Sequence, residues 1–118
     1  MDRRTSTRPN GPGTPPVYGY RPPPTSDRLI RARDLVCRFP GCRHPATHTD
    51  LDHLIAYPAG PTTPHNLWAL CRRHHRLKHT SHWQVHALTD AGTTGPITWT
   101  TPSGLTRTTT PPHYTRRQ

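Results

Sequence analysis

The hydrophobic residues of this chain fall into short groups separated by stretches rich in proline, glycine and threonine. In "DRLIRARDLV", residues 27–36, the aliphatic side chains recur at near-helical spacing, and Asp27 can cap the first turn. In "THTDLDHLIAY", residues 47–57, polar and apolar side chains alternate, which is typical of a strand. We therefore expect a short helix and then a strand, with the turn-forming "CRFPGC" between them.

The second half of the chain predicts one more helix and a small sheet. Thr63 can cap a helix that begins near Pro64 and runs to residue 79, with a buried stripe formed by Leu67, Leu70 and Leu77. Alternating segments separated by turn-rich sequences then predict two or three antiparallel strands, including a C-terminal β-hairpin, at 82–88, 96–100 and 105–109. The predicted fold class is α+β.

Both ends of the chain differ in composition from its centre. Residues 1–26 are rich in proline, glycine, threonine and arginine and contain almost no aliphatic side chains, so we expect a disordered Pro/Arg-rich arm. Its arginines could contact phosphate, but a plain linker is the favoured interpretation. The sequence thus predicts an arm at 1–26, one domain at 27–115 with its core at 37–80, and a tail at 116–118.

The composition leaves little material for a hydrophobic core. Only 29% of the 118 residues are hydrophobic, and the chain contains 16 prolines and 8 glycines. Small domains of this kind usually depend on disulfides, a structural metal or oligomerisation. The 3 cysteines cannot all pair within the chain, and no apolar run resembles a signal peptide or a membrane span. We therefore expect a cytoplasmic protein whose cysteines serve as thiolate ligands.

Two short motifs pair residues at the spacing of metal ligands. One is C-x4-C around a Pro-Gly turn and the other is C-x2-H further along, and together they supply Cys37, Cys42, Cys71 and His74. Two such pairs are typical of a closed tetrahedral zinc site, which would cross-link the chain and replace missing core energy. Two alternatives stay open. His44 or His48 could replace His74, or the first two cysteines could form a local disulfide while the third is merely buried.

A second group of polar residues suggests a different metal site. The Asp52 carboxylate and the His75 imidazole suit a divalent ion such as Mg2+ or Mn2+, and His79, one helical turn later, can share it. His53 offers a neutral imidazole that could activate water. Asp52 and His53 are neighbours on the predicted strand, so they point to opposite faces unless the strand twists or bulges.

The charge of the chain predicts a polyanionic partner. A formal net charge of +10 favours nucleic acid, because each neutralised phosphate releases condensed counterions. Cationic side chains lie between the proposed metal ligands of the last predicted helix. This alternation favours phosphate contact by Arg72, Arg73, Arg76 and Lys78. A merely soluble basic protein is the alternative.

The segments "CRFPGC", "DLDHL", "HNLWALC" and "RRHHRLKH", in this order, resemble an HNH endonuclease of the zinc-stapled type. The resemblance is greatest to the HNH tail of large actinobacterial repeat proteins, and it covers about residues 20–115. It implies a small ββα-metal (His-Me finger) fold with a structural zinc. It also implies that the enzyme hydrolyses DNA phosphodiester bonds. These proteins carry an upstream domain, so we expect this chain to be a free-standing nuclease, a truncated gene product or a fragment.

The resemblance also implies a role for each matched residue. His53 becomes the general base, Asp52 and His75 hold the catalytic Mg2+ or Mn2+, and Asn66 either fixes the strand bearing His53 or approaches the metal. The chain departs from the family at Ala56, where a proline is usual, and "AGP" replaces a Gly-Gly turn. The main competing hypothesis is a zinc-stabilised nucleic-acid-binding module that does not cleave, and a third is an inactive fragment.

Overall fold

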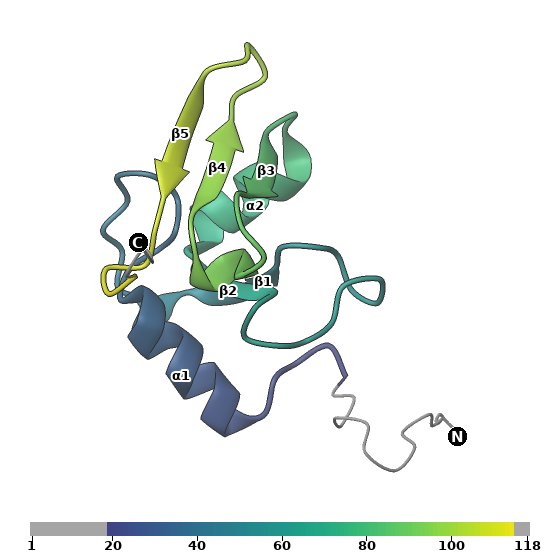
Figure 1. Cartoon of the computed structure of the whole chain (residues 1–118), viewed down its shortest axis with the longest axis vertical. Coiled ribbons are helices and arrows are strands. Elements are labelled where there is room, and N and C mark those ends of the chain that lie inside the picture. Colours follow the sequence, from purple (N-terminus) through teal and green to yellow (C-terminus); the bar gives the residue numbers. More distant parts are fainter. Residues whose placement is uncertain (1–18, 115–118) are drawn as a thin grey trace.

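The computed structural model describes residues 19–114, which contain two α-helices and two small antiparallel sheets (Figure 1). The predicted α+β class is thereby confirmed. Two single-turn 3-10 helices occur at Ala46–His48 and Gly92–Thr94. The remaining elements, in chain order, are α1 (Pro24–Asp34), β1 (Asp50–His53), β2 (Leu67–Leu70), α2 (Arg72–Thr80), β3 (Gln84–Ala87), β4 (Ile97–Thr100) and β5 (Thr106–Thr109).

Helix α1 begins at Pro24, ahead of Asp27, where the sequence pattern places its start. Proline is well tolerated there, because the first N–H groups of a helix have no partner within it. Part of the predicted arm thus belongs to the ordered domain. Residues 1–18 of that arm and the predicted tail at 116–118 lie outside the described residues.

The prediction of one helix from about residue 64 to 79 is wrong in its first half. Residues Leu67–Leu70 form strand β2, which pairs antiparallel with β1 and places Asp52 opposite Trp68. All four residues of β2 are fully buried, whereas a surface helix would bury only one stripe. Helix α2 starts only at Arg72, and Cys71 stands before it in an extended conformation.

The three predicted C-terminal strands are confirmed and form a sheet of order β3-β4-β5. In Figure 1 this sheet and α1 lie at opposite ends of the molecule, with β1 and β2 between them. The two sheets share one core, in which Trp68 of β2 stacks on Trp99 of β4 with ring centroids 5.2 Å apart. Cys37 and Cys71 belong to the same buried cluster, so the core is continuous with the predicted zinc ligands.

A buried ion pair joins α1 to the rest of the fold. The Asp34 carboxylate accepts hydrogen bonds from Arg38 at 2.9 Å and from the Ala69 backbone of β2 at 2.9 Å. Arg38 also donates to the Thr93 carbonyl at 2.6 Å and to the Gly95 carbonyl at 3.0 Å. Burial lowers the pKa of Arg38, which the Asp34 charge partly offsets. The pair thus ties α1, β2 and the loop before β4 together.

Candidate functional site

The four predicted zinc ligands come together in one cluster. The sulfurs of Cys37, Cys42 and Cys71 and a ring nitrogen of His74 all lie within 4.8 Å of one another. A turn through Gly41, at φ 82°, brings the first two thiols together, and the start of α2 supplies the other two ligands. This Cys3His cluster could hold a tetrahedral zinc ion.

The alternatives to this ligand set do not agree with the structure. All three cysteines are free thiols, so Cys37 and Cys42 form no local disulfide. His44 instead lies beside the His48 backbone, with its Nε2 3.2 Å from the carbonyl oxygen, and neither ring belongs to the cluster. Among the described residues, His74 is therefore the imidazole that completes the cluster.

The Cys3His cluster lies in an aromatic enclosure. The Phe39 ring stacks on His74 with centroids 3.9 Å apart and also contacts Trp99. Burial raises the pKa of the Cys37 thiol to about 12, and burial together with the Arg73 charge lowers the pKa of His74. His74 is thereby kept neutral, as a ligand must be, whereas the thiol needs a bound cation to lose its proton at neutral pH.

A second cluster forms between β1 and α2. Ligand atoms of Asp52, His75 and His79 lie within 4.8 Å of one another. The Asp52 Oδ1 atom is 2.8 Å from Nε2 of His79 and 3.3 Å from Nε2 of His75. The two imidazoles come from successive turns of α2 and therefore face the same side of the helix. One carboxylate and two imidazoles form a donor set that suits a divalent metal ion.

The Asp52 carboxylate is buried but electrically compensated. Its Oδ2 atom accepts hydrogen bonds from the Trp68 indole at 3.0 Å and from the Lys78 ammonium at 2.9 Å. Burial alone would raise the pKa of Asp52, but the hydrogen bond from His75 and the charge of Lys78 hold it well below its usual range. Lys78 also donates to the His53 carbonyl at 3.1 Å, so this lysine is an internal partner of the site rather than a surface cation.

Asp50 is a residue of the site that the sequence reasoning missed. Its Oδ2 atom accepts hydrogen bonds from Nδ1 of His75 at 2.8 Å and from Arg72 at 2.8 Å. These bonds, the one from Arg72 first, lower the pKa of Asp50 despite partial burial. The Nδ1–H group of His75 is thus engaged, and Nε2 is directed at Asp52, as in carboxylate–histidine–metal triads. The available signal was that Asp50 and Asp52 share one face of a strand.

His53 faces a different environment from its neighbour Asp52. Its Nε2 atom lies 2.9 Å from the Thr62 hydroxyl, which donates its proton to the Gly19 carbonyl at 2.7 Å. A hydroxyl has only one proton, so Thr62 must accept the bond from His53, and Nδ1 is left as the basic nitrogen. Burial lowers the pKa of His53, although the Asp52 charge opposes this, and the ring is therefore neutral at pH 7.

The side chain of Asn66 organises the loop that follows His53. It accepts a hydrogen bond from the Ile55 N–H and donates to the carbonyls of Ile55 and Pro61, each at 2.9 Å. A Cβ atom at Gly60 would collide with the Ile55 carbonyl and approach the Asn66 amide to 2.6 Å, so "AGP" still requires its glycine. Both the oxygen and the nitrogen of the Asn66 amide are engaged by these backbone groups, which agrees with the strand-fixing alternative.

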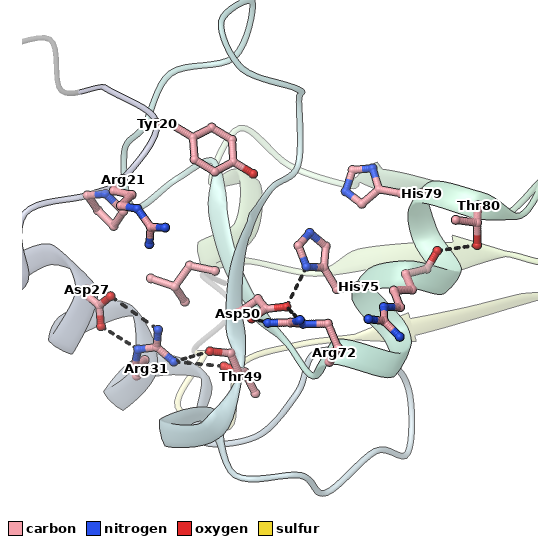
Figure 2. Close-up of a pocket in the computed structure, with 13 residues that line it drawn as sticks. Tyr20, Arg21, Asp27, Arg31, Thr49, Asp50, Arg72, His75, His79 and Thr80 are labelled. Carbon is pink, nitrogen blue, oxygen red and sulfur yellow. Dashed lines mark hydrogen bonds and ion pairs between the residues drawn. The ribbon is translucent and has the colours of Figure 1, made fainter.

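A groove of about 550 Å³ opens beside the second cluster. Figure 2 shows Tyr20 and Arg21 on one side of it and Arg72, His75 and His79 of α2 on the other. Arg72 is bound by Asp50, whereas Arg21 and Arg76 have no ion pair among the described residues. The groove therefore places the guanidinium groups of Arg21 and Arg76 next to the carboxylate–imidazole cluster, which suits an anionic ligand.

This chain is similar to short segments of longer proteins. It is 47% identical over 93 residues to the uncharacterized protein Rv3776 of Mycobacterium tuberculosis, covering 78% of this chain and 17% of that protein. It is 46% identical over 93 residues to Rv2100 of the same organism, covering 78% of this chain and 16% of that protein. No family model and no solved structure matches the chain. Neither helix in residues 19–114 is long and apolar enough to cross a membrane.

Proposed function

We propose that this domain is an HNH-type endonuclease that hydrolyses DNA phosphodiester bonds. One observation carries the proposal. Asp52, His75 and His79 form one cluster, and the neutral His53, which follows Asp52 on β1, is held separately by Thr62. The succession of β1, β2 and α2 around these residues agrees with the ββα-metal fold that the sequence resemblance implies. The match to parts of longer proteins agrees with an HNH domain attached to other domains.

In this proposal His53 is the general base. Its Nδ1 atom takes a proton from the water that attacks the scissile phosphorus, and the neutral ring is ready to do so at pH 7. Thr62 keeps the other nitrogen protonated, which maintains the basic tautomer. Asn66 holds the loop that lies next to this strand, so that His53 keeps its position.

The donor set of the second cluster fits a divalent cation. Asp52 is ionised although it is buried, and Asp50 directs Nε2 of His75 toward it. A bound Mg2+ or Mn2+ would stabilise the charge that develops on the leaving oxygen. The two imidazoles suit Mn2+ at least as well as Mg2+, which prefers oxygen ligands and water. By the same resemblance, the products carry a 5'-phosphate and a 3'-hydroxyl.

The second candidate function is a nucleic-acid-binding module that does not cleave. The Cys3His cluster, the net charge of +10 and the arginines at the groove support it. Binding alone, however, gives no reason for a buried carboxylate that contacts two imidazoles, or for a second carboxylate that orients one of them. These contacts favour the nuclease.

The test is to incubate the purified chain with supercoiled plasmid and Mg2+ or Mn2+. We expect nicking by the wild type, none by His53→Ala, and full activity in His86→Ala, whose side chain lies on strand β3 away from both clusters. Equal nicking by wild type and His53→Ala would refute the assigned base. A wild type that binds the plasmid but leaves it intact with both ions would support the module instead.

A further inference from the structure

Two tyrosine rings beside His53 have no role in the proposed chemistry. The centroids of Tyr20 and Tyr57 lie 5.0 Å and 5.6 Å from that of His53, and 5.8 Å from each other at an interplanar angle of 85°. Tyr20 is nevertheless 57% exposed and Tyr57 is 40% exposed. Rings that served only to pack His53 would be buried more deeply, so much of their aromatic surface remains open to a ligand.

The backbone holds Tyr20 in this position. The preceding residue, Gly19, accepts the hydrogen bond from Thr62 at 2.7 Å, and α1 begins shortly afterwards at Pro24. The backbone next to Tyr20 is thus anchored to the loop that also contacts the proposed general base, and the ring lies beside His53. A tyrosine side chain has few rotatable bonds, so binding against it costs little further conformational entropy.

The same tyrosine lies at the edge of the groove described above. Figure 2 shows the groove between Tyr20 and Arg21 on one side and the two histidines of α2 on the other, and Arg76 also lines it. Arg21 and Arg76 form no ion pair within residues 19–114, so both charges can meet phosphate groups. An aromatic surface and a cationic groove therefore adjoin each other at the proposed site of cleavage.

This juxtaposition is the one by which proteins bind single strands, with phosphates in a basic groove and bases stacked on aromatic rings. The faces of bases in a duplex are covered by their neighbours, and a ring reaches them only after unstacking. We propose that the groove binds single-stranded DNA, with an unpaired base next to the scissile phosphate stacked on Tyr20 and flanked by Tyr57. The position of the scissile phosphate rests on the proposed nuclease function, whereas the binding does not.

The binding test uses fluorescence anisotropy with a labelled single-stranded DNA oligonucleotide and a duplex of the same sequence, at one salt concentration and without added Mg2+ or Mn2+. We expect the single strand to bind more tightly. Tyr20→Ala should weaken single-strand binding at least about fivefold and leave duplex binding unchanged, because stacking contributes about 1–3 kcal/mol per base. Tyr20→Phe keeps the ring and should bind normally. Leu88→Ala is the matched control, since it removes an equally exposed apolar side chain elsewhere.

Several results would overturn the proposal. These are a duplex that binds as tightly as the single strand, an equal loss for both ligands in Tyr20→Ala, and a single-stranded RNA that binds more tightly than DNA. If Tyr20→Ala is unfolded by circular dichroism, Tyr57→Ala replaces it, with a smaller loss expected for the single strand only. A chain that shows this selectivity but cleaves no strand with either Mg2+ or Mn2+ would refute the nuclease and leave the binding site standing.

Discussion

His74 and His75 are neighbours on α2, yet their rings belong to clusters of opposite character. The His74 cluster combines three thiols with one imidazole under the Phe39 ring, and burial raises the pKa of Cys37 there. In the His75 cluster burial also raises the pKa of Asp52, but the imidazoles and Lys78 lower it by more, so the carboxylate is ionised. The first cluster needs a cation to become charged, whereas the second is charged before any ion binds. Folding should therefore depend on metal at the first cluster only.

The position of the helix start explains how adjacent residues can serve both clusters. Cys71 precedes α2 in an extended conformation, so its sulfur reaches the thiols of the CRFPGC turn. His74 lies in the first turn of α2, and its ring joins the three sulfurs in the Cys3His cluster. The next residue is rotated by about 100° around the helix axis, which turns His75 toward β1 and its two aspartates.

The largest difference between the clusters should appear in Cys71→Ser. Structural zinc contributes roughly 10–16 kcal/mol in small zinc-dependent domains, about as much as the whole stability of a typical domain. We expect the variant to lose its zinc and its cooperative thermal transition, as measured by metal analysis and circular dichroism. Chelation of the wild type should have the same effect. A Cys71→Ser protein that stays folded with one equivalent of zinc would contradict the ligand assignment.

His75→Ala tests the second cluster from the adjacent position. Asp52 keeps its bonds to Lys78, His79 and Trp68, so the fold and the zinc content should be unchanged. Plasmid nicking with Mn2+ should fall about a hundredfold or more, because stabilisation of developing charge by a metal contributes several kcal/mol. Single-turnover nicking and thermal denaturation measure the two effects. Zinc loss in His75→Ala would show that the two clusters are not separate.

Asp50→Asn should weaken the second cluster without removing a ligand. An amide cannot replace the charge that orients His75, and loss of such a partner typically costs 10- to 100-fold in metal affinity. We expect that decrease in Mn2+ affinity by titration calorimetry, with nicking restored at high Mn2+ concentration. Asp90→Asn, on the surface between β3 and β4, is the matched control. An unchanged Mn2+ affinity would exclude an orienting role for Asp50.

Local spacing predicted the Cys3His cluster well, because each ligand pair is close in sequence and is joined by one turn or one helical step. Strand β2 was not predicted, because its local pattern carries no such signal. Its four apolar residues, "LWAL", are buried on both faces and show neither the period of a helix nor that of a strand. The helical pattern of "RRHHRLKH" therefore predicts a helix that begins too early and crosses Cys71.

The partners of the second site could not be read from spacing. Thr62 meets His53 through a loop, and Asp50 meets His75 across the interface between β1 and α2. In the sequence Lys78 is one more cationic residue among arginines, and only the fold shows that its ammonium group contacts Asp52. Tertiary contacts of this kind decide which charged groups are internal partners and which remain available for phosphate.

The smallest effect that still separates chemistry from packing is expected at Thr62. Thr62→Val keeps the shape of the side chain but removes the hydroxyl that accepts from His53 and donates to Gly19. A net hydrogen bond contributes about 1 kcal/mol, so the nicking rate at saturating DNA should fall about fivefold, while Thr62→Ser should keep the wild-type rate.

Two readouts distinguish the consequences of losing this hydroxyl. Loss of the His53 tautomer should lower kcat and should change the 15N shifts of the ring, which in the wild type should show the proton on Nε2. Loss of the hydrogen bond to Gly19 should instead weaken single-strand binding, because the backbone next to Tyr20 is no longer anchored beside His53. Thr62→Ser should restore both properties. A Thr62→Val protein with wild-type kcat and an unchanged His53 tautomer would show that the hydroxyl only packs the loop.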